Sequence, residues 1–269
     1  GRFVRSINEL GEPIYMKHFN IAIDGPAGAG KSTIARRAAG QLGFVYVDTG
    51  AMYRAMALYF LRKGINPADE EAVSRACGQA EVSIRYQDGA QQVLLNGEDV
   101  SGQIRTEEVG KTASVVSAYM PVREKLTELQ KELAARENVI MDGRDIGTCV
   151  LPQAPAKIYL TASVEVRALR RFRELTEKGE ACDLEEIKKD IADRDWKDMH
   201  REHAPLKQAE DAVVVDSSQM TIDQVVEAIL AVAKEKGLKI AGDCEAAGAA
   251  CEEADSGASD AVRSEDSEA

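Results

Sequence analysis

The chain has 269 residues, of which 44% are hydrophobic and 30% charged, and its formal net charge is −12. This length excludes a disulfide-stapled miniprotein and fits one large α/β domain or two smaller ones. The apolar content excludes global disorder, and no apolar run reaches the roughly 18 residues that a membrane helix needs. The chain also lacks the basic field that a nucleic-acid-binding protein requires.

Both ends of the chain differ in composition from the rest. Residues 241–269 hold nine acidic residues, one arginine and no aromatic residue. Such a segment cannot bury enough apolar surface to offset the entropy lost on ordering, so we predict a disordered acidic tail. Residues 1–17 lack the apolar core of a secretory signal and are predicted to be a leader. Residues 18–240 are then the folded domain.

The cysteines indicate a reducing compartment. There are five, they are scattered, and no C-x-x-C pair occurs, so neither a zinc site nor a disulfide framework is predicted. We therefore expect a cytoplasmic protein. The five are Cys77, Cys149, Cys182, Cys244 and Cys251.

Short apolar segments alternate with helical patterns along the domain. Strands are predicted, in chain order, over 19–24, 44–48, 139–142, 157–161 and 212–216. Helices are predicted over 30–42, 50–63 and 221–236, the last with a T-x-x-Q capping box. This alternation predicts a parallel sheet covered by helices on both faces, which is a three-layer α/β fold.

One stretch interrupts the alternation. Residues 82–86 (VSIRY) and 91–95 (QQVLL) flank an Asp88-Gly89 turn, which predicts a hairpin. Two helices are predicted after it, over 106–118 and 121–136, the second with Pro121 in its first turn. We interpret residues 66–136 as an inserted subdomain.

The segment after the first strand fits the phosphate-binding pattern G-x-x-x-x-G-K-[ST], from Gly25 to Ser32. Its glycines let backbone N–H groups surround an anion, and the helix that follows directs its positive end to the same place. Lys31 would reach the β- and γ-phosphates and the Ser32 hydroxyl would ligate Mg²⁺. The sequence therefore predicts that the protein binds a nucleoside triphosphate with magnesium.

Three uses of that phosphate compete: a GTPase switch, an ATPase motor, and a kinase for a small acceptor. A guanine-specific switch needs N-K-x-D, which is absent. Arginines favour the kinase, because phosphoryl transfer needs positioning and charge neutralisation. Besides Arg54 and Arg144, two sets share a predicted helix face, although each also fits a solvated surface. They are Arg167, Arg170 and Arg171, and Asp190, Arg194, Asp198 and Arg201.

An acceptor that is itself a phosphate simplifies the chemistry. Its second pKa is about 6, so it is largely dianionic at neutral pH and needs no general base. The chain has only three histidines, His18, His200 and His203, and none has an obvious catalytic setting. This composition agrees with a reaction that runs by charge neutralisation.

Five blocks in order resemble the bacterial-type cytidylate kinases, which transfer the γ-phosphate of ATP to CMP or dCMP. They are IDGPAGAGKST (23–33), VDTGAMYRA (47–55), LNGEDVSGQIRTEEV (95–109), MDGRDIGT (141–148) and RDWKDMHREHAPLKQAEDAVVVDSS (194–218). The likeness runs from about Phe19 to Lys236. It implies a P-loop NTPase fold in which residues 66–136 are the monophosphate-binding insertion and about 163–182 a short mobile lid.

The resemblance also implies site residues. The ATP phosphates would be held by Gly25, Pro26, Ala27, Gly28, Ala29, Gly30, Lys31, Ser32 and Thr33. Thr49 would lie near the acceptor, Arg54, Arg144 and Arg201 would hold the CMP phosphate, and Arg194 and Asp198 would meet the ribose. Ser114, Arg123 and Asp145 would read the base, since a carboxylate accepts from the cytosine amino group and an arginine donates to its acceptors.

The implied catalytic groups are cationic: Lys31, Arg144 and the lid arginines Arg167, Arg170 and Arg171. Asp142 would orient Mg²⁺ through water. ATP and CMP or dCMP are the expected partners, with no nucleic acid and no membrane, and a monomer is expected.

Three alternatives to a CMP kinase stay open. The chain could phosphorylate another monophosphate, such as UMP or AMP. It could be a nucleotide-gated binding protein with no acceptor, or a scaffold that is recruited through its acidic tail.

Overall fold

The computed structural model describes residues 3–7, 13–16 and 18–239. The predicted tail over 241–269 lies outside the described residues. Within the predicted leader, β1 (Phe3–Ile7) and β2 (Pro13–Met16) pair antiparallel in a two-stranded sheet of their own. None of the helices in these ranges is long and apolar enough to cross a membrane.

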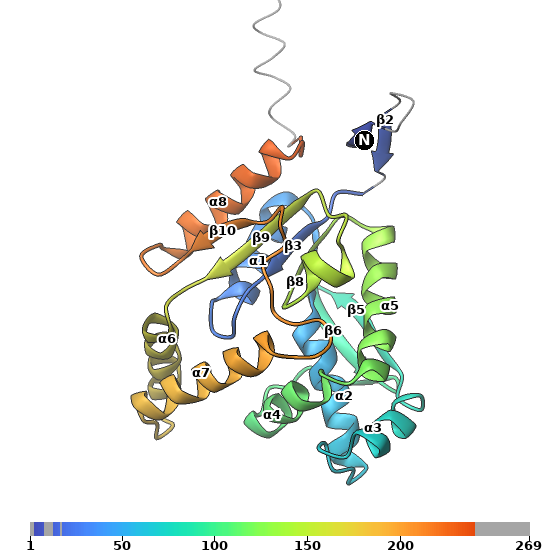
Figure 1. Ribbon diagram of the computed structural model, residues 1–269, viewed down its shortest axis with the longest axis vertical. Helices are drawn as coiled ribbons and strands as arrows, with labels where there is room; N and C mark the ends of the chain where they lie inside the picture. The colour runs from blue at the N-terminus through green and yellow to red at the C-terminus, as the bar shows by residue number, and fades with distance from the viewer. Residues whose placement is uncertain (1–2, 8–12, 17, 240–269) are drawn as a thin grey trace, which may run out of the picture.

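A five-stranded parallel sheet forms the centre of the domain, as the alternation predicted (Figure 1). Its strand order is β10-β9-β3-β8-β4. The central strands β3 and β8 are buried along their whole length, because apolar side chains on both faces meet a helical layer. The five strands are β3 (Ile21–Asp24), β4 (Val45–Asp48), β8 (Val139–Gly143), β9 (Ala156–Thr161) and β10 (Val213–Asp216).

Helices cover both faces and complete the three predicted layers. On one face, α1 (Lys31–Leu42) and α8 (Ile222–Glu235) pack on β3 and β9 through Ile34, Ile158 and Ile229. On the other, α2 (Thr49–Arg62) and α5 (Met120–Arg136) form a second core with β4 and β8. Thr221 and Gln224 form the predicted capping box at the start of α8.

The interrupting stretch forms a second, smaller sheet beside the first. The predicted hairpin is present as β5 (Val82–Gln87) and β6 (Ala90–Leu95), with Asp88 and Gly89 both at positive φ, and the two predicted helices are present as α4 (Glu107–Val116) and α5. The prediction missed α3 (Glu70–Cys77) and β7 (Glu98–Asp99). Both are short, and α3 buries only two side chains, so neither has a readable periodicity.

Three side chains fasten this small sheet to the end of β4. The Tyr86 hydroxyl donates to the Tyr46 carbonyl at 2.9 Å, and the Gln91 side chain accepts from the Asp48 backbone N–H at 2.9 Å. Arg105, in the loop after β7, donates to the Asp48 carboxylate at 2.8 Å. The inserted residues are therefore held against the carboxyl edge of the central sheet.

The stretch before β10 holds α6 (Val164–Glu177) and α7 (Leu184–Met199), which pack on each other at the lower left of Figure 1. The prediction that Arg201 shares a helical face with Asp190, Arg194 and Asp198 is wrong, because α7 ends at Met199. His200 caps the helix, and the chain turns away through Ala204 at φ 48°. Pro205 follows, and proline disfavours helix at the residue before it.

Replacement of Gly25 tests how closely the phosphate-binding loop approaches the sheet. A Cβ there would lie 1.9 Å from the Leu160 carbonyl oxygen, so we expect Gly25→Ala to lower the free energy of unfolding by several kcal/mol, above the ~1–3 kcal/mol of ordinary substitutions. Gly43→Ala is the control, since it also has positive φ but nothing within 4 Å. Its expected loss is about 1 kcal/mol. Equal losses in urea unfolding would contradict this account.

Candidate active site

A cleft of about 320 Å³ lies at the carboxyl edge of the central sheet, between the phosphate-binding loop, α2, α4 and α7. Every residue that the resemblance assigned to CMP lines it: Thr49, Arg54, Ser114, Arg123, Arg144, Asp145, Arg194, Asp198 and Arg201. Of the residues assigned to ATP, those that line it are Ala27, Gly28, Gly30, Lys31, Ser32 and Thr33. Side chains from four distant parts of the chain thus meet in one space.

The phosphate-binding loop is shaped by positive-φ glycines. Gly28 and Gly30 have φ of 75° and 85°, which glycine adopts without strain, and α1 begins at the next residue. Gly25, Pro26 and Ala29 do not line the cleft; Gly25 packs against β9 and Ala29 is fully buried. They shape the loop rather than face its contents.

Lys31 folds back onto its own loop. Its Nζ donates to the Pro26 carbonyl at 2.7 Å and the residue is only 5% exposed. Burial, and then the positive charge of Arg144, lower the pKa of Lys31 well below its ordinary value, while Asp142 and Asp24 act in the opposite direction. An anion in the cleft would favour the charged form of Lys31 and so raise its pKa again.

Two oxygen groups that suit magnesium are in contact. The Ser32 hydroxyl donates to Oδ2 of Asp142 at 2.9 Å, and the Tyr46 hydroxyl donates to Oδ1 at 3.1 Å. Burial, followed by the negative charge of Asp48, raises the pKa of Asp142 to about 6. The Thr49 hydroxyl donates to the Asp142 backbone carbonyl at 2.7 Å, so this residue ties α2 to the end of β8.

Asp198 holds two of the cleft arginines. It is fully buried, and its carboxylate accepts from Nε of Arg144 at 2.9 Å and from Arg201. Burial alone would raise the pKa of this carboxyl, but the charges of Arg144, Arg201 and Arg194 outweigh it, and the pKa lies below its usual value. The contact joins α7 to the end of β8.

Two other cleft arginines, Arg194 and Arg54, form no ion pair with the residues that the structure describes. Nε of Arg194 is buried and has no hydrogen-bond partner among the described residues. Burial, and then the charge of Arg144, lower the pKa of Arg194 to about 10. Arg54 donates to the carbonyl of Ile104 at 3.0 Å and lies over Gly110, where a Cβ would come within 3.0 Å of its guanidinium. This arrangement leaves positive charge that a bound anion can neutralise.

A buried ion pair closes the other end of the cleft. Arg123 is 4% exposed and donates to Asp145, which is equally buried, and to the Ser117 carbonyl at 2.9 Å. The Arg123 guanidinium also lies over the Tyr53 ring, 5.5 Å from its centroid. Ser114 faces this end from α4. A planar base would find a donor, an acceptor and an aromatic ring here.

The α6 arginines do not line the cleft. Arg167 is 4% exposed and donates to the Ala27 carbonyl at 2.9 Å and to Asp195 at 2.6 Å. Arg170 donates to the Ser217 carbonyl at 2.8 Å. Arg171 pairs with Glu174 on the surface, with its side chain 45% exposed.

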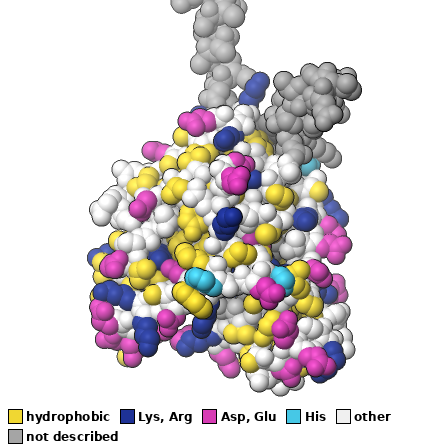
Figure 2. All heavy atoms as spheres, viewed as in Figure 1, with side chains coloured by type: hydrophobic (Ala, Val, Ile, Leu, Met, Phe, Trp, Pro, Cys, Tyr) yellow, Lys and Arg dark blue, Asp and Glu magenta, His cyan; other side chains and the backbone are white. Residues whose placement is uncertain are grey.

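The cleft is more positive than the surface around it. Seven Lys or Arg residues line it against four Asp residues, in a chain whose net charge is −12. On the face in Figure 2, basic and acidic side chains are interspersed. The site therefore attracts anions through a local cluster of charges and not through the field of the whole protein.

Sequence reasoning missed several lining residues: Asp48, Gly50, Tyr53, Arg105, Ala113, Ser117 and Gly143. Most of them lie inside the blocks that carry the resemblance, which was the available signal. Arg105 reaches the cleft only because the inserted sheet docks on β4, a contact that local spacing does not encode.

The family model for cytidylate kinase matches residues 21–235. The cytidylate kinase of Shouchella clausii is 52% identical over 219 residues, which are 81% of this chain and 97% of that protein. The cytidylate kinase of Lactobacillus johnsonii is 50% identical over 80% of this chain and 94% of its own length. A solved shikimate kinase from Acinetobacter baumannii, in complex with shikimate, is 18% identical with a TM-score of 0.42, over 83% of this chain and 97% of that one. This chain belongs to the cytidylate kinase family.

Proposed function

We propose that the cleft binds ATP on the phosphate-binding loop and CMP or dCMP between α2, α4 and α7, and that it transfers the γ-phosphate between them. The observation that carries this proposal is the continuity of the cleft. Its phosphate-binding loop, its arginine cluster and its Arg123–Asp145 pair line one space. An acceptor bound by its base at one end would present its phosphate to the donor at the other.

The reaction needs charge neutralisation more than proton transfer. An oxygen of the CMP phosphate attacks the γ-phosphorus of ATP, the bond from that phosphorus to the β,γ-bridging oxygen breaks, and ADP leaves. The acceptor phosphate is largely dianionic at neutral pH, because its second pKa is about 6, so no side chain has to remove a proton. The protein's part is to bring two polyanions together in line.

Arginines supply that neutralisation. Arg54, Arg144 and Arg201 line the same cleft as the phosphate-binding loop and are proposed to hold the CMP phosphate. Arg194 and Asp198, which share one face of α7, are proposed to meet the ribose. The unpartnered Nε of Arg194 supports this role, because a buried donor without a partner is unfavourable until a ligand accepts from it.

The Arg123–Asp145 pair is proposed to read the base, with Ser114. Cytosine carries an amino group beside ring acceptors, so the carboxylate accepts from the first and the guanidinium donates to the second. Uracil has a carbonyl in place of the amino group and would face the Asp145 carboxylate with an acceptor. A buried carboxylate without its donor costs about 1–3 kcal/mol, which sets the scale of selectivity.

The residues at the phosphate-binding loop fit a magnesium ion. Ser32 and Asp142 bring hard oxygen atoms together at 2.9 Å beside the loop. The described residues contain no group of three acidic, histidine or cysteine side chains that could hold a metal alone, so Mg²⁺ would share its ligands with ATP. We propose Ser32 as a direct ligand and Asp142 as a ligand through water. When bound, Mg²⁺ neutralises charge on the phosphates.

Residues 163–182 are proposed to close over the cleft as a lid. Of the three lid arginines, Arg171 has the most exposed contact, a surface pair with Glu174. Arg167 is already bound to the phosphate-binding loop through the Ala27 carbonyl. We propose that all three add positive charge around the transferring phosphate. Arg167 would act from its place against the phosphate-binding loop, to which it is bonded at the Ala27 carbonyl. The division of the chain into leader, domain and tail, its monomeric state and its cytoplasmic location stay predictions.

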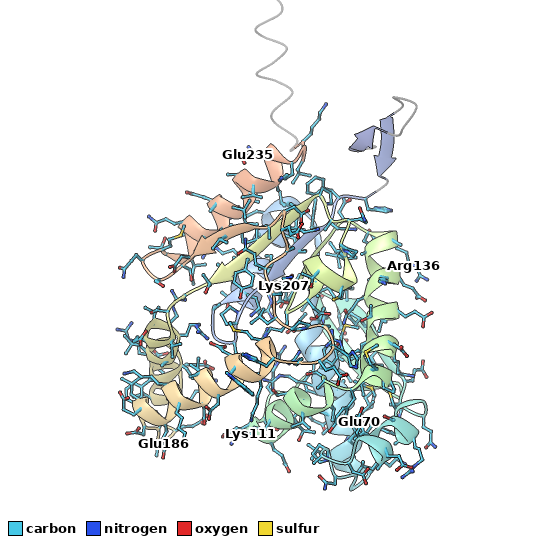
Figure 3. All side chains as sticks on the ribbon, viewed as in Figure 1. Glu70, Lys111, Arg136, Glu186, Lys207 and Glu235 are labelled. Atoms are coloured by element: carbon cyan, nitrogen blue, oxygen red, sulfur yellow. The ribbon has the colours of Figure 1, made fainter. Side chains whose placement is uncertain are left out.

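Removal of the Arg144 guanidinium tests the arginine cluster. We expect Arg144→Ala to lower kcat/KM for CMP by about 100-fold or more, because a charged donor to the transferring groups is lost. CMP-dependent ADP release measures this. The control is Arg136→Ala on the outer side of α5 (Figure 3), whose ion pair is exposed and which should keep normal activity. Equal activity of the two variants would contradict the proposal.

Neutralisation of Asp145 tests base recognition. We expect Asp145→Asn to lower kcat/KM for CMP by roughly 10–100-fold, because a charge-assisted hydrogen bond to the amino group is lost. Activity with UMP should stay level or rise, since the new amide can donate to the uracil carbonyl. Initial rates with both nucleotides give the ratio. The idea fails if the CMP to UMP ratio of the variant matches that of the wild type.

The low pKa of Asp198 predicts a pH-dependent contribution to stability. A carboxyl whose pKa is lower in the folded state than its ordinary value of 3.8 stabilises the fold at pH values above 3.8. This stabilisation is lost as the pH falls through the folded-state pKa. We expect Asp198→Asn to cost about 3 kcal/mol at pH 7 and its difference from the wild type to shrink below about pH 4. Urea unfolding across this range measures it. A difference that grows toward low pH would contradict the sign.

A further inference from the structure

The loop that carries Arg144 and Asp145 continues into a short π-helix, η1 (Ile146–Val150). The first N–H groups of any helix have no partner within the helix and need an acceptor from outside. Asp145 occupies the N-cap position, where aspartate commonly supplies that acceptor itself. Here it makes no such bond, and its carboxylate pairs with Arg123 in the cleft.

Asp24 supplies the missing acceptors from a distant part of the sequence. Its Oδ1 accepts from the Ile146 N–H at 2.8 Å and its Oδ2 from the Gly147 N–H at 2.7 Å. Asp24 ends β3 and is 4% exposed, so both bonds are shielded from water. Each carboxylate oxygen caps one amide, and the two bonds fix where η1 begins.

The contact is built from both sides. A Cβ on Gly147 would lie 3.3 Å from Oδ2 of Asp24 and 3.2 Å from Cδ of Lys157, so glycine permits the close approach. Lys157 is itself fixed, because its Nζ donates to Asp211 at 2.8 Å and to the Pro152 carbonyl at 2.6 Å. The Gly147 amide is thus held against Asp24.

We infer that Asp24 is a positioning residue for base recognition: it caps η1 in place of Asp145 and so leaves the Asp145 carboxylate to face Arg123 and the base. The inference rests on the proposed role of Asp145 in reading cytosine. Without Asp24, two buried N–H groups lose their acceptor, and the carboxylate that directly precedes them in the sequence is that of Asp145, the N-cap residue. A carboxylate that turned to cap its own helix would leave the cleft.

The position of Asp24 gives it a second consequence. It directly precedes Gly25, the first residue of the phosphate-binding loop. The same side chain therefore ties the start of the donor loop to the start of η1, which fixes the acceptor's base site relative to the donor's phosphates. Burial, and to a smaller extent the nearby charge of Asp145, raise the pKa of Asp24 to about 6, which agrees with two carboxylates held close together.

The test is the selectivity of Asp24→Asn. This variant keeps the side-chain shape and one acceptor oxygen, but its NH₂ group faces a backbone N–H. We expect the ratio of kcat/KM for CMP to that for UMP to fall by about tenfold, with most of the change in KM for CMP. A purely structural role would lower activity with both nucleotides and leave the ratio unchanged, and that result would overturn the inference.

A double variant separates this inference from the proposed function. If Asp24 acts through Asp145, then Asp24→Asn combined with Asp145→Asn should be no less selective than Asp145→Asn alone. Independent, multiplying losses of selectivity would overturn the inference. If Asp145→Asn alone leaves selectivity intact, the proposed base recognition is wrong. If Asp145→Asn loses selectivity but Asp24→Asn keeps it, base recognition stands and only the positioning role of Asp24 is wrong.

Two further variants keep the inference testable if Asp24→Asn does not fold. Gly147→Ala presses a methyl group against Asp24 without removing a charge, and it should lower the CMP to UMP ratio in the same direction by a smaller factor. Asp69→Ala is the matched control, because Asp69 caps α3 through the Ala72 N–H, outside the cleft. Its selectivity should equal that of the wild type. An unchanged ratio in Gly147→Ala, or a lowered one in Asp69→Ala, would contradict the positioning role.

Discussion

Positive charge gathered in partly buried guanidinium groups is the constraint on which this site depends. Arg144, Arg194 and Arg201 line the cleft with Lys31. Burial, and after it the positive charge of Arg144, lower the pKa values of Arg194, Arg201 and Lys31. Asp198 compensates for part of that charge, since it accepts from two of the arginines, but Nε of Arg194 has no partner among the described residues. The fold thus holds positive charge that an anionic ligand would neutralise. Such a site is less stable when empty, and the hydrophobic layers on both sides of the sheet offset that loss.

The carboxylates of the site act mainly as holders of other groups. Asp24, Asp48 and Asp142 lie at or near the ends of three neighbouring parallel strands. Asp24 accepts from two backbone amides, Asp48 accepts from Ala51 and from Arg105, and Asp142 accepts from Ser32 and Tyr46. These contacts join the strand ends to η1, to α1, to α2 and to the loop that carries Arg105, and the Tyr46 contact joins β4 to β8. Because parallel strands place their carboxyl ends at one edge of the sheet, these three aspartates lie side by side and together hold the segments that surround the cleft.

Local patterns predicted the parts of the fold whose causes are local. The buried strands, the helix between Gly30 and Gly43, the Asp88-Gly89 hairpin and the α8 capping box all follow from spacing or turn chemistry. The phosphate-binding pattern gave Lys31 and Ser32, whereas the roles of Ser114, Arg123 and Asp198 came from the family resemblance, since alone these three look like polar surface residues. Spacing could not give η1, because the distant Asp24 carboxylate accepts from its first two amides. The end of α7 before Arg201 was missed because the i, i+4, i+8, i+11 spacing continues past the residue at which the helix ends.

Arg167 shows how such a distant contact changes the meaning of a residue. As one of three spaced arginines it fits a solvated basic face, yet it is buried and bonded to the Ala27 carbonyl and to Asp195. Gly28 lies against Arg167: a Cβ added to this glycine would be 3.5 Å from Cβ of Arg167. One guanidinium therefore joins α6, α7 and the phosphate-binding loop. Closure of residues 163–182 as the proposed lid would therefore either carry the phosphate-binding loop along with α6 or exchange these bonds for others. The shape of the donor site and the position of the α6–α7 pair are linked through this side chain.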